Sequence, residues 1–260
     1  MVKRIILSFV AVFASFVVIL AAIEINSNNP LSVIKHNKLQ DRIVAENAVL
    51  VFTVDFQGII PAGRGRVTNM GLEPYQNKKA YHLTARAYPL DIYKKFIHVQ
   101  AAIDSYVDPD KLSTLKFKQS ILLPNNTRQD KEILYDQAKN IMELSGVKRQ
   151  IFPNTQDPLS VMFYIQHQKL ELGKEFDLNI NTNQKNYQFF IKVAGRREYT
   201  IGGKRIGVWL LDGIVRRRNK NVYHRTTMRL WVLDGESKIP ILIRTVSNAG
   251  LITARLTGIE

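Results

Sequence analysis

The stretch "NYQFFIKVAGRREYTIGGKRIGVWLL", residues 186–211, decides the fold class. In its first part every second side chain is large and apolar, a spacing that is typical of a half-buried strand. These side chains are Tyr187, Phe189, Ile191 and Val193. Two glycines, Gly202 and Gly203, then separate this run from a second strand-like run, and such a connection favours a tight β-hairpin. The stretch therefore predicts two antiparallel strands.

The same alternation continues on both sides of this stretch. Downstream, Asp234-Gly235 and residues 247–250 reverse the chain between further apolar runs. Residues 91–108 fit either a helix or an irregular strand. The upstream segments that read as strands are residues 49–58, 63–69, 78–88, 115–123 and 131–144. The sequence therefore predicts an all-β meander of antiparallel strands.

The segment "DPLSVMFYIQHQKL", residues 157–170, predicts the one clear helix, over about residues 158–170. Asp157 suits the N-cap, and Pro158 suits the first helical position, where its missing N–H has no intrahelical partner. Residues 161–165 then follow without a polar side chain. One turn that is apolar on every side indicates a helix buried in the body of the protein.

The N-terminus predicts export. Two basic residues precede an apolar run, Ile5–Ile23, that is about long enough to span a bilayer. Residues 1–23 are therefore a cleaved signal peptide or an uncleaved membrane anchor, and both alternatives stay open. Residues 24–45 read as a polar tether and residues 46–260 as the β domain. The absence of Cys suits a bacterial periplasm better than a disulfide-linked extracellular scaffold.

The chain is basic, with 37 Lys and Arg against 22 Asp and Glu and a net charge of +15. Such an excess favours attraction to anions. Basic residues are concentrated between Lys204 and Arg229, and part of this segment is a candidate for contact with anions or a membrane surface. The candidate residues are Arg216, Arg217, Arg218, Arg225 and Arg229. A solvated outer face is the alternative, and nucleic acid is not expected as a partner because an exported chain rarely meets it.

The order of these segments resembles that of the bacterial envelope family called Domain of Unknown Function 3108. The shared pattern is an Asp-Pro pair that opens a short apolar helix, then a glycine and an extended segment, here "DPLSVMFYIQHQKLELGKEFDLNI". It continues through "FFIKVAGRREYTIGGKRIGVWLL", "MRLWVLDGESKIPILIRT" and "AGLITARL", and covers Asn47 to Gly258. The resemblance implies a single all-β domain, a curled antiparallel sheet or partly open β-barrel-like body with one or two short helices. It supplies no catalytic residues.

A curled sheet has a concave apolar face, which offers the helix a place to be buried. Packing as part of the core is one interpretation. The other is a plug beside a hydrophobic ligand pocket, since barrel mouths and concave sheets are common ligand sites. Met162, Phe163 and Tyr164 would then line the pocket, and the head group of an anionic ligand would meet the arginines from Arg216 to Arg218.

No motif with catalytic chemistry stands out in the sequence. The five His residues form no H-E-x-x-H motif, and we expect no metal site and no cofactor. There is no G-x-S-x-G elbow, and the S-x-x-K match at Ser113–Lys116 lacks the further motifs of its class. The carboxylates are scattered along the chain. An enzyme is therefore the minority interpretation.

Three functions are compatible with the sequence. The first is a periplasmic or envelope carrier that binds a hydrophobic or anionic amphipathic molecule without catalysis. The second is a structural or assembly factor of the envelope that contacts another protein or peptidoglycan, and the third is a hydrolase of cell-wall glycan. An enclosed apolar cavity would favour the first function and a tightly filled concave face the second. Two carboxylates about 5 to 9.5 Å apart in a cleft would favour the third.

Overall fold

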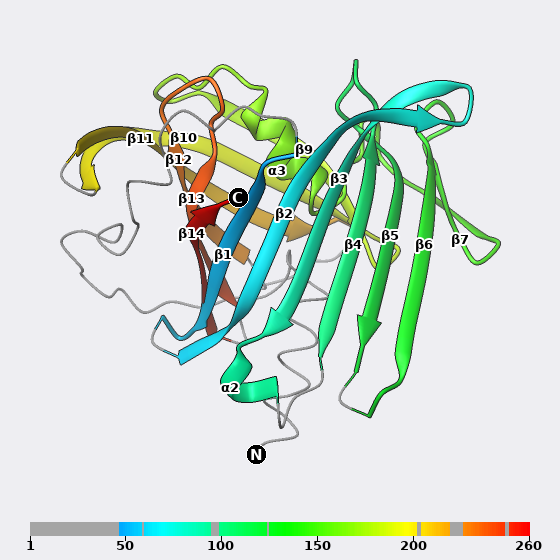
Figure 1. Cartoon of the computed structure of the whole chain (residues 1–260). Coiled ribbons are helices and arrows are strands. Elements are labelled where there is room, and N and C mark those ends of the chain that lie inside the picture. The colour runs from blue at the N-terminus through cyan, green and yellow to red at the C-terminus, as the bar shows by residue number, and fades with distance from the viewer. Residues whose placement is uncertain are drawn as a thin grey trace.

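The computed structural model describes residues 47–58, 60–94, 99–123, 125–201, 204–218, 226–247 and 250–260. These residues form one sheet of 14 strands with two short helices, which confirms the predicted all-β fold class (Figure 1). The elements up to the second helix are β1 (Val49–Phe56), β2 (Ile60–Tyr75), β3 (Lys78–Pro89), α2 (Asp91–Lys94), β4 (Gln100–Val107), β5 (Thr114–Leu122), β6 (Arg128–Asp136), β7 (Ile141–Leu144), β8 (Val147–Gln150) and α3 (Ser160–Gln166). The strands that follow are β9 (Glu175–Thr182), β10 (Lys185–Ile201), β11 (Lys204–Arg217), β12 (Thr226–Leu233), β13 (Pro240–Ser247) and β14 (Gly250–Ile259).

Residues 1–46 lie outside the described part of the chain, so the signal peptide or anchor, the tether and the domain boundaries stay predictions. No helix within the described ranges is long and apolar enough to cross a membrane. The Gly202-Gly203 turn also lies outside them. The two strands that flank it, β10 and β11, pair antiparallel along their length up to Ile201 and Lys204, as the predicted hairpin requires.

Each strand pairs antiparallel with its neighbours in the sheet, in the order β8-β7-β6-β5-β4-β3-β2-β1-β14-β13-β12-β11-β10-β9. Two meanders, β1 to β8 and β9 to β14, are joined where β1 pairs with β14, for example at Val54 opposite Ala254. Within each meander the pairing follows chain order, because short turns join consecutive strands. The pairing of the first strand with the last is a long-range contact that the alternation of side chains does not predict.

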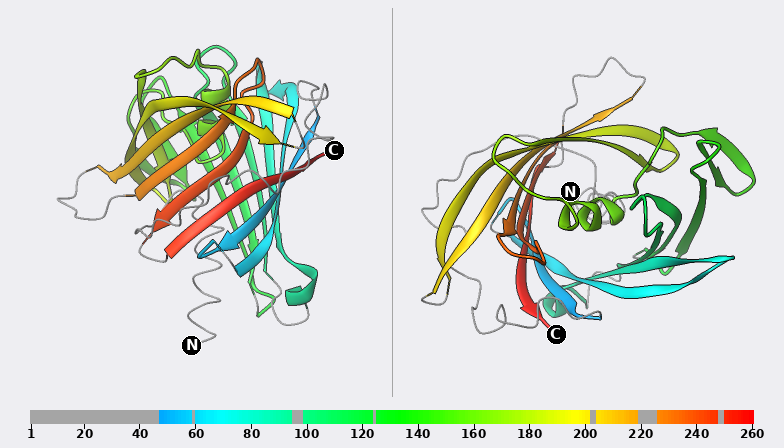
Figure 2. Two further views of the ribbon diagram at one scale, coloured as in Figure 1. Left: turned by 90° about the vertical axis from the view of Figure 1, so that its left-hand side faces the viewer. Right: turned by 90° about the horizontal axis from the view of Figure 1, so that it is seen from above.

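The sheet curls around α3 but does not close into a barrel, since its edge strands β8 and β9 do not pair with each other (Figure 2). Bulges contribute to the curl, because an extra residue bends a strand and increases its twist. They shift the register at Val54/Asp55 in β1, at Asn69/Leu72 in β2 and at Val193/Gly195 in β10. The bulge in β2 contains Gly71 at a φ of 83°, a left-handed conformation that glycine adopts without strain.

The core lies inside the curl, between α3 and the concave face of the sheet (Figure 2, right). The side chains of β10 that the alternation assigns to one face are all buried there, namely Tyr187, Phe189, Ile191 and Val193. From α3, the side chains of Val161, Phe163 and Ile165 are buried, whereas Met162 and Tyr164 are half-buried. The helix is therefore enclosed over most of its circumference, in agreement with its apolar sequence.

The helix is shorter than the predicted span of residues 158–170 at both ends, since Pro158 and Leu159 form a turn and α3 begins at Ser160. It ends at Gln166 because the chain leaves it in a tighter turn, in which the N–H of Gln168 donates to the carbonyl of Ile165 at 3.1 Å. This turn takes Leu170 into the core, where it is 6% exposed. The chain thus buries the Leu170 side chain in the core instead of continuing as a helix.

Other segments also differ from the prediction. The predicted strand over residues 63–69 covers only the middle of β2, which extends from Ile60 to Tyr75, and β8 is not predicted from the sequence. Residues 131–144 contain the end of β6 and the whole of β7, with a turn between the two strands. Asn140 stands in this turn at a φ of 55°, a left-handed conformation that Asn tolerates better than most residues. Residues 91–108 contain both of the alternatives left open, the short helix α2 followed by the strand β4.

The opening between β8 and β9 is bridged by the segment that follows β8. The carbonyl of Thr155 accepts a hydrogen bond from the N–H of Thr114 at the start of β5, at 3.1 Å. Gln156 forms a parallel bridge to β9, through its N–H to Asn179 O at 2.7 Å and its carbonyl to Asn181 N at 2.8 Å. These main-chain bonds link the two halves of the sheet and hold the start of α3 inside the curl.

A lysine also crosses this opening. Lys131 of β6 donates a hydrogen bond from Nζ to Asn183 Oδ1 at 2.6 Å, and its ammonium lies 5.6 Å from the centroid of the Phe117 ring. Burial lowers the pKa of Lys131 from 10.5 to about 8. Between these two pH values the unfolded chain binds more protons than the folded protein, so stability rises with pH in this window.

Replacement of Lys131 by Met is expected to stabilise the protein at neutral pH. Below pH 8 the folded protein carries the full cost of a partly desolvated charge, and the Met side chain has no such cost. We expect a gain in the free energy of unfolding of about 1–2 kcal/mol at pH 7, since the lost hydrogen bond offsets part of the shift. The gain should shrink towards pH 10.5 in urea titrations. Lys79→Met in the exposed β2–β3 hairpin is the matched control. An equal gain in the free energy of unfolding for Lys131→Met at pH 7 and at pH 10.5 would contradict the interpretation.

Candidate functional site

A cavity of about 480 Å³ lies inside the curl, between the concave face of β1 to β4, α3 and the loop that joins β12 to β13. Its lining is mainly apolar and includes Phe52 and Val54 of β1, Leu83 of β3 and Met162 and Phe163 of α3. The volume falls within the range of about 300–1,000 Å³ that is typical of sites for small molecules. The concave face is therefore not completely filled by the core.

A row of small residues on adjacent strands leaves the space that forms the cavity. Gly65 of β2 lies opposite Ala87 of β3, which in turn lies opposite Ala101 of β4, and all three line the cavity. A Cβ atom added at Gly65 would have Phe52 Cβ as its nearest neighbour, at 3.9 Å, an ordinary contact distance. The packing therefore leaves room for a larger residue at Gly65, and the choice of small side chains keeps this part of the concave face open.

The wall opposite the row is α3. Met162 and Phe163 lie in the wall of the cavity, whereas Tyr164 is not among the lining residues and packs against the main core. The Phe163 ring lies 4.9 Å from the ring of Tyr81 and 4.2 Å from that of His167, measured between centroids. The structure thus places two of the three predicted residues at the cavity, and their contact with a ligand stays a prediction.

A buried carboxylate fixes α3 in this position. The Asp157 carboxylate accepts hydrogen bonds from the N–H groups of Leu159 and Ser160, at 2.7 and 3.1 Å, as expected of a residue that caps the start of the helix. It also accepts from the hydroxyls of Ser105 in β4 and Thr114 in β5, at 2.5 and 2.8 Å. Burial raises the pKa of Asp157, and the hydrogen bond from Ser105 opposes this effect. One side chain therefore joins the helix to two strands.

The arginines from Arg216 to Arg218 lie away from the cavity, at the end of β11 and just beyond it. Arg216 is exposed, and the side chain of Arg218 is held by the protein itself. Its Nη2 donates to Asn179 Oδ1 at 2.7 Å, and its guanidinium lies 4.3 Å from the centroid of the Phe152 ring. The structure does not bring these arginines together with Met162 and Phe163, so one ligand in this cavity would not meet both sets.

The other two predicted arginines are Arg225 and Arg229, and Arg229 is not part of the cavity lining. Arg229 of β12 points to the outer face, where its guanidinium forms an ion pair with Asp212 at 2.6 Å. Arg225 lies outside the described residues. Contact of these arginines with anions or with a membrane surface stays a prediction, separate from the cavity.

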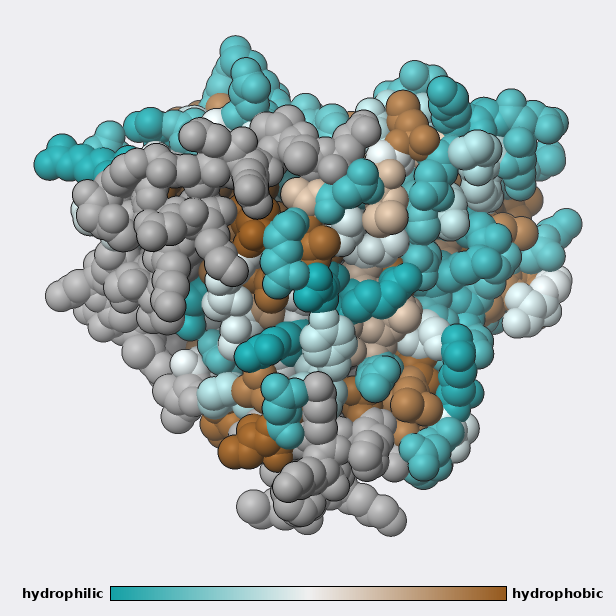
Figure 3. Space-filling model, viewed as in Figure 1, coloured by the Kyte–Doolittle hydropathy of each residue, from teal (hydrophilic) through white to brown (hydrophobic). Residues whose placement is uncertain are grey.

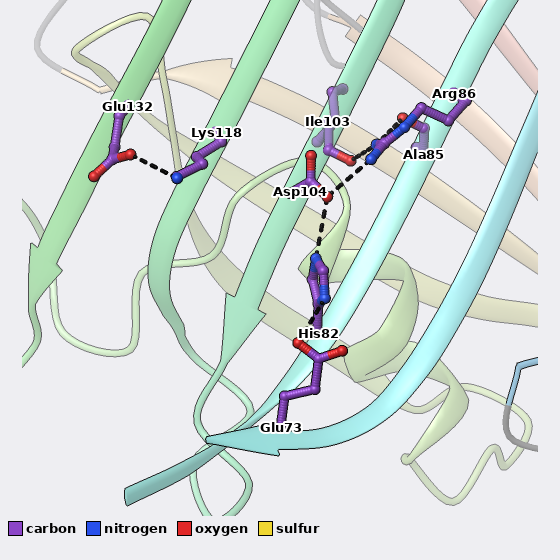
Figure 4. A network of polar contacts seen from close by, with 8 residues as sticks. All are labelled: Glu73, His82, Ala85, Arg86, Ile103, Asp104, Lys118 and Glu132. Carbon is purple, nitrogen blue, oxygen red and sulfur yellow. Dashed lines mark hydrogen bonds and ion pairs between the residues drawn. The ribbon is translucent and has the colours of Figure 1, made fainter. Parts of the chain in front are cut away.

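A cluster of titratable groups lies on the outer face of β2 to β4 (Figure 4). The two ring nitrogens of His82 lie 2.9 Å from the Glu73 carboxylate and 3.1 Å from the Asp104 carboxylate. Arg86 Nη2 also donates to Asp104, at 3.0 Å, and the imidazole stacks on Tyr106 with the centroids 4.5 Å apart. The hydrogen bond to Asp104 raises the pKa of His82, so the charged imidazolium is favoured between the two carboxylates.

Glu73, His82 and Asp104 of this cluster are not among the residues that line the cavity, whereas Arg86, which pairs with Asp104, also contributes to the cavity wall. Burial raises the pKa of Asp104, but hydrogen bonds from His82 and Arg86 outweigh it and leave the pKa below its ordinary value. A neighbouring ion pair, Lys118–Glu132 at 3.1 Å, lies on the same face, where hydrophilic side chains predominate (Figure 3). We interpret the cluster as a network that joins adjacent strands.

The described residues that line the cavity include few groups that could bind a metal ion or transfer a proton. Among them no group of three or more His, Cys, Asp or Glu side chains is placed to hold a metal ion. Within the described ranges, Glu236 is the one carboxylate residue that lines the cavity. His36, His98 and His224 lie outside these ranges. The described lining residues thus include no second carboxylate of the kind that a glycosidase site requires.

Several residues of the cavity were not identified from the sequence. The small residues Ala85 and Ala87 stand at inward positions of β3, and this change in size is visible in "YHLTARAY". Ser105 and Thr114 carry no comparable signal, because hydroxyl residues are common in strands. Their role depends on the long-range approach of Asp157.

Comparison with known proteins agrees with the predicted resemblance. Residues 51–257 match the family described as "Protein of unknown function (DUF3108)". The chain belongs to this family. The match covers nearly the whole described sheet, from β1 to β14, and the family description assigns no activity. No curated protein matches the sequence.

Two solved structures show similarity to the curled sheet. The first is described as a β-barrel-like protein of the unknown-function family DUF1849 from Brucella abortus, with a TM-score of 0.50 and 10% identity over 82% of this chain and 97% of that chain. The second is a protein of the family DUF1089 from Pseudomonas aeruginosa, with a TM-score of 0.35 and 9% identity over 68% of this chain and 87% of that chain. The first similarity supports a β-barrel-like fold and nothing further.

Proposed function

We propose that this protein binds a small hydrophobic or amphipathic molecule of the bacterial envelope in the cavity beside α3, as a carrier without catalytic activity. The observation that carries the proposal is the open space of about 480 Å³ between the small-residue row and the helix. Apolar lining of this kind stabilises a bound aliphatic group by removing it from water, at roughly 25 cal/mol per Å² of buried surface. At Gly65 the surrounding packing would accept a Cβ atom, but the position carries no side chain.

The proposed location is the periplasm, with the protein either secreted or held at the inner membrane. It is supported by the basic start of the chain and the apolar run Ile5–Ile23. A periplasmic carrier meets its ligand at a membrane, so a lipid or another anionic envelope component is the proposed partner. Fractionation of cells with a tagged full-length chain tests the location, and recovery with cytoplasmic proteins would contradict it.

The two alternative functions find less support in the described residues. An assembly factor would have no need of an unfilled concave face, and the row from Gly65 to Ala101 keeps that face open. A glycan hydrolase would need two carboxylates across a cleft, whereas Glu236 stands without a second one in the lining. The carrier is therefore the function that the cavity favours.

The proposal predicts that filling the cavity abolishes binding without loss of the fold. In the variant Ala85→Leu/Ala87→Leu, two larger side chains project from β3 into the space that a ligand would occupy. We expect affinity for a neutral fluorescent probe, N-phenyl-1-naphthylamine, to fall at least about 10-fold, the effect of losing about 1.4 kcal/mol of binding free energy. Circular dichroism should remain that of a β protein.

Ala194→Leu is the matched control, because it adds the same side chain at an exposed position of β10. It should leave probe binding unchanged. Equal affinity of the cavity variant and the parent would contradict the proposal. Native mass spectrometry of protein purified from its own envelope gives an independent measurement, with a co-purifying lipid as the expected result.

A further inference from the structure

The polar residues that line the cavity fall into two groups. The first group comes from β2 and β3, and its two arginines are already bound elsewhere: Arg66 pairs with Glu260 at 2.6 Å, and Arg86 pairs with Asp104 at 3.0 Å. The second group comes from the end of α3 and the loop between β12 and β13, and we call it the cavity rim. Its members are Gln166, His167, Glu236, Ser237 and Lys238.

Lys238 is the half-buried cation of this rim. Its Nζ donates to the carbonyls of Gln166 and Glu236, at 3.3 and 3.4 Å. An ammonium has three N–H donors, so two long bonds to carbonyls leave one donor and the whole positive charge available. No carboxylate of the described residues lies within ion-pair distance of this ammonium, in contrast to Arg66 and Arg86.

The neighbours of Lys238 on the rim add hydrogen-bond donors. Gln166 contributes a side-chain amide and Ser237 a hydroxyl. His167 is held by the helix, with Nδ1 2.8 Å from the carbonyl of Phe163. Glu236 is exposed, so water screens its carboxylate more strongly than it screens the half-buried ammonium. The rim therefore favours an acceptor-rich group with negative charge.

The backbone at Lys238 is consistent with a role for its side chain. Its φ is 41°, in the left-handed region that glycine adopts freely and that a long side chain rarely adopts. A glycine would suit the loop better at this position, so the conformation is kept in spite of its cost. The ammonium also bonds a carbonyl at the end of α3, a contact that stabilises the helix by itself. If Lys238 only stabilises the end of α3, its replacement should not change the preference for an anionic ligand. If it binds the ligand, its replacement should remove that preference.

We propose that the ligand is an amphiphile with a carboxylate or phosphate head group, which Lys238 binds at the cavity rim while its aliphatic tail lies against Met162 and the small-residue row. This inference rests on the proposed function, since it assumes that the cavity takes up a tail. It moves the anion contact from the arginines of β11 to the loop between β12 and β13. The charge-assisted bond supplies preference for an anionic head group, and the apolar wall supplies affinity that is independent of the head.

Isothermal titration of the full-length chain with matched probes tests the proposal. Decanoate, decyl phosphate and decan-1-ol share one tail and differ in the charge of the head, and inorganic phosphate has the head alone. We expect both anionic probes to bind about 10-fold more tightly than the alcohol, and inorganic phosphate to show no measurable binding. In Lys238→Met the preference should disappear while affinity for the alcohol stays the same.

Two further variants separate binding from folding. Lys238→Arg should retain the preference because it keeps the charge, and Lys79→Met in the β2–β3 hairpin should bind like the parent. Thermal unfolding of each variant checks that the fold is intact. Equal affinity of the parent for alcohol and acid would overturn the head-group proposal and leave the carrier function standing, as would a preference that survives in Lys238→Met. Binding of inorganic phosphate alone would also overturn it, and failure of all four probes would overturn the carrier function as well.

Discussion

Asp157→Ala is expected to lower the free energy of unfolding by about 4 kcal/mol or more. The fully buried carboxylate accepts four hydrogen bonds, and their donors lose their partner in the variant. An unsatisfied buried donor costs about 1–3 kcal/mol, although reorientation of the two hydroxyls recovers part of the loss. The change should also weaken the attachment of α3 to β4, because the Ser105 hydroxyl loses its partner, whereas Thr114 keeps its hydrogen bonds to the Ser160 hydroxyl and the N–H of residue 157. Urea unfolding followed by tryptophan fluorescence measures the effect.

Two companion variants make this expectation specific. Asp157→Asn keeps one oxygen for the N–H groups of Leu159 and Ser160, so we expect about half the loss. Asp110→Ala removes the same carboxylate from an exposed turn and should change stability by less than about 0.5 kcal/mol. A loss below about 1 kcal/mol for Asp157→Ala would contradict the role assigned to the carboxylate.

Phe163→Ala is the second substitution with a large expected effect. The ring is 5% exposed and packs with Leu83 and Val107 as well as with Tyr81. Truncation of a buried Phe costs about 3–5 kcal/mol, because the transfer free energy of the ring is lost and a void remains. The void would adjoin the existing cavity, so we expect the variant to be destabilised while retaining room for a bound probe. Thermal and urea unfolding measure the loss of stability, and probe titration measures whether the variant still binds the probe.

A double-mutant cycle measures how much of this loss in free energy comes from the contact between the two aromatic rings. Tyr81→Ala and Phe163→Ala should show a coupling of about 0.5–1.5 kcal/mol, the range found for packed aromatic pairs. Leu172→Ala is the control for truncation without burial, since Leu172 is 73% exposed. A strictly additive cycle would show that the two rings do not stabilise each other.

The sequence predicts the local parts of the candidate site better than its assembly. The cap at Asp157 and the burial of α3 follow from residue types within one short segment, and both are present in the structure. The grouping of distant residues into one site does not follow from residue types alone. Their charge suggests Arg216 to Arg218 as the contact for an anionic head group, but these arginines lie away from the cavity, and their contact with anions stays a prediction. Charge indicates what a residue can bind, but its distance from the cavity depends on which strands are neighbours.

By itself the sequence determined the strands, their faces and the helix, because these depend on residues within a few positions of one another. The alternation in β10 and the antiparallel pairing of β10 with β11 are examples, and both rest on short-range geometry. Only the tertiary structure decided the rest. The pairing of β1 with β14 joins the two meanders, and the resulting curl encloses space between a row of small residues and a helix. The contact of Lys238 with Gln166 likewise joins distant segments. Period-two alternation says which side chains share a face, but an enclosed volume depends on how far the sheet bends and on the sizes of side chains from separate strands.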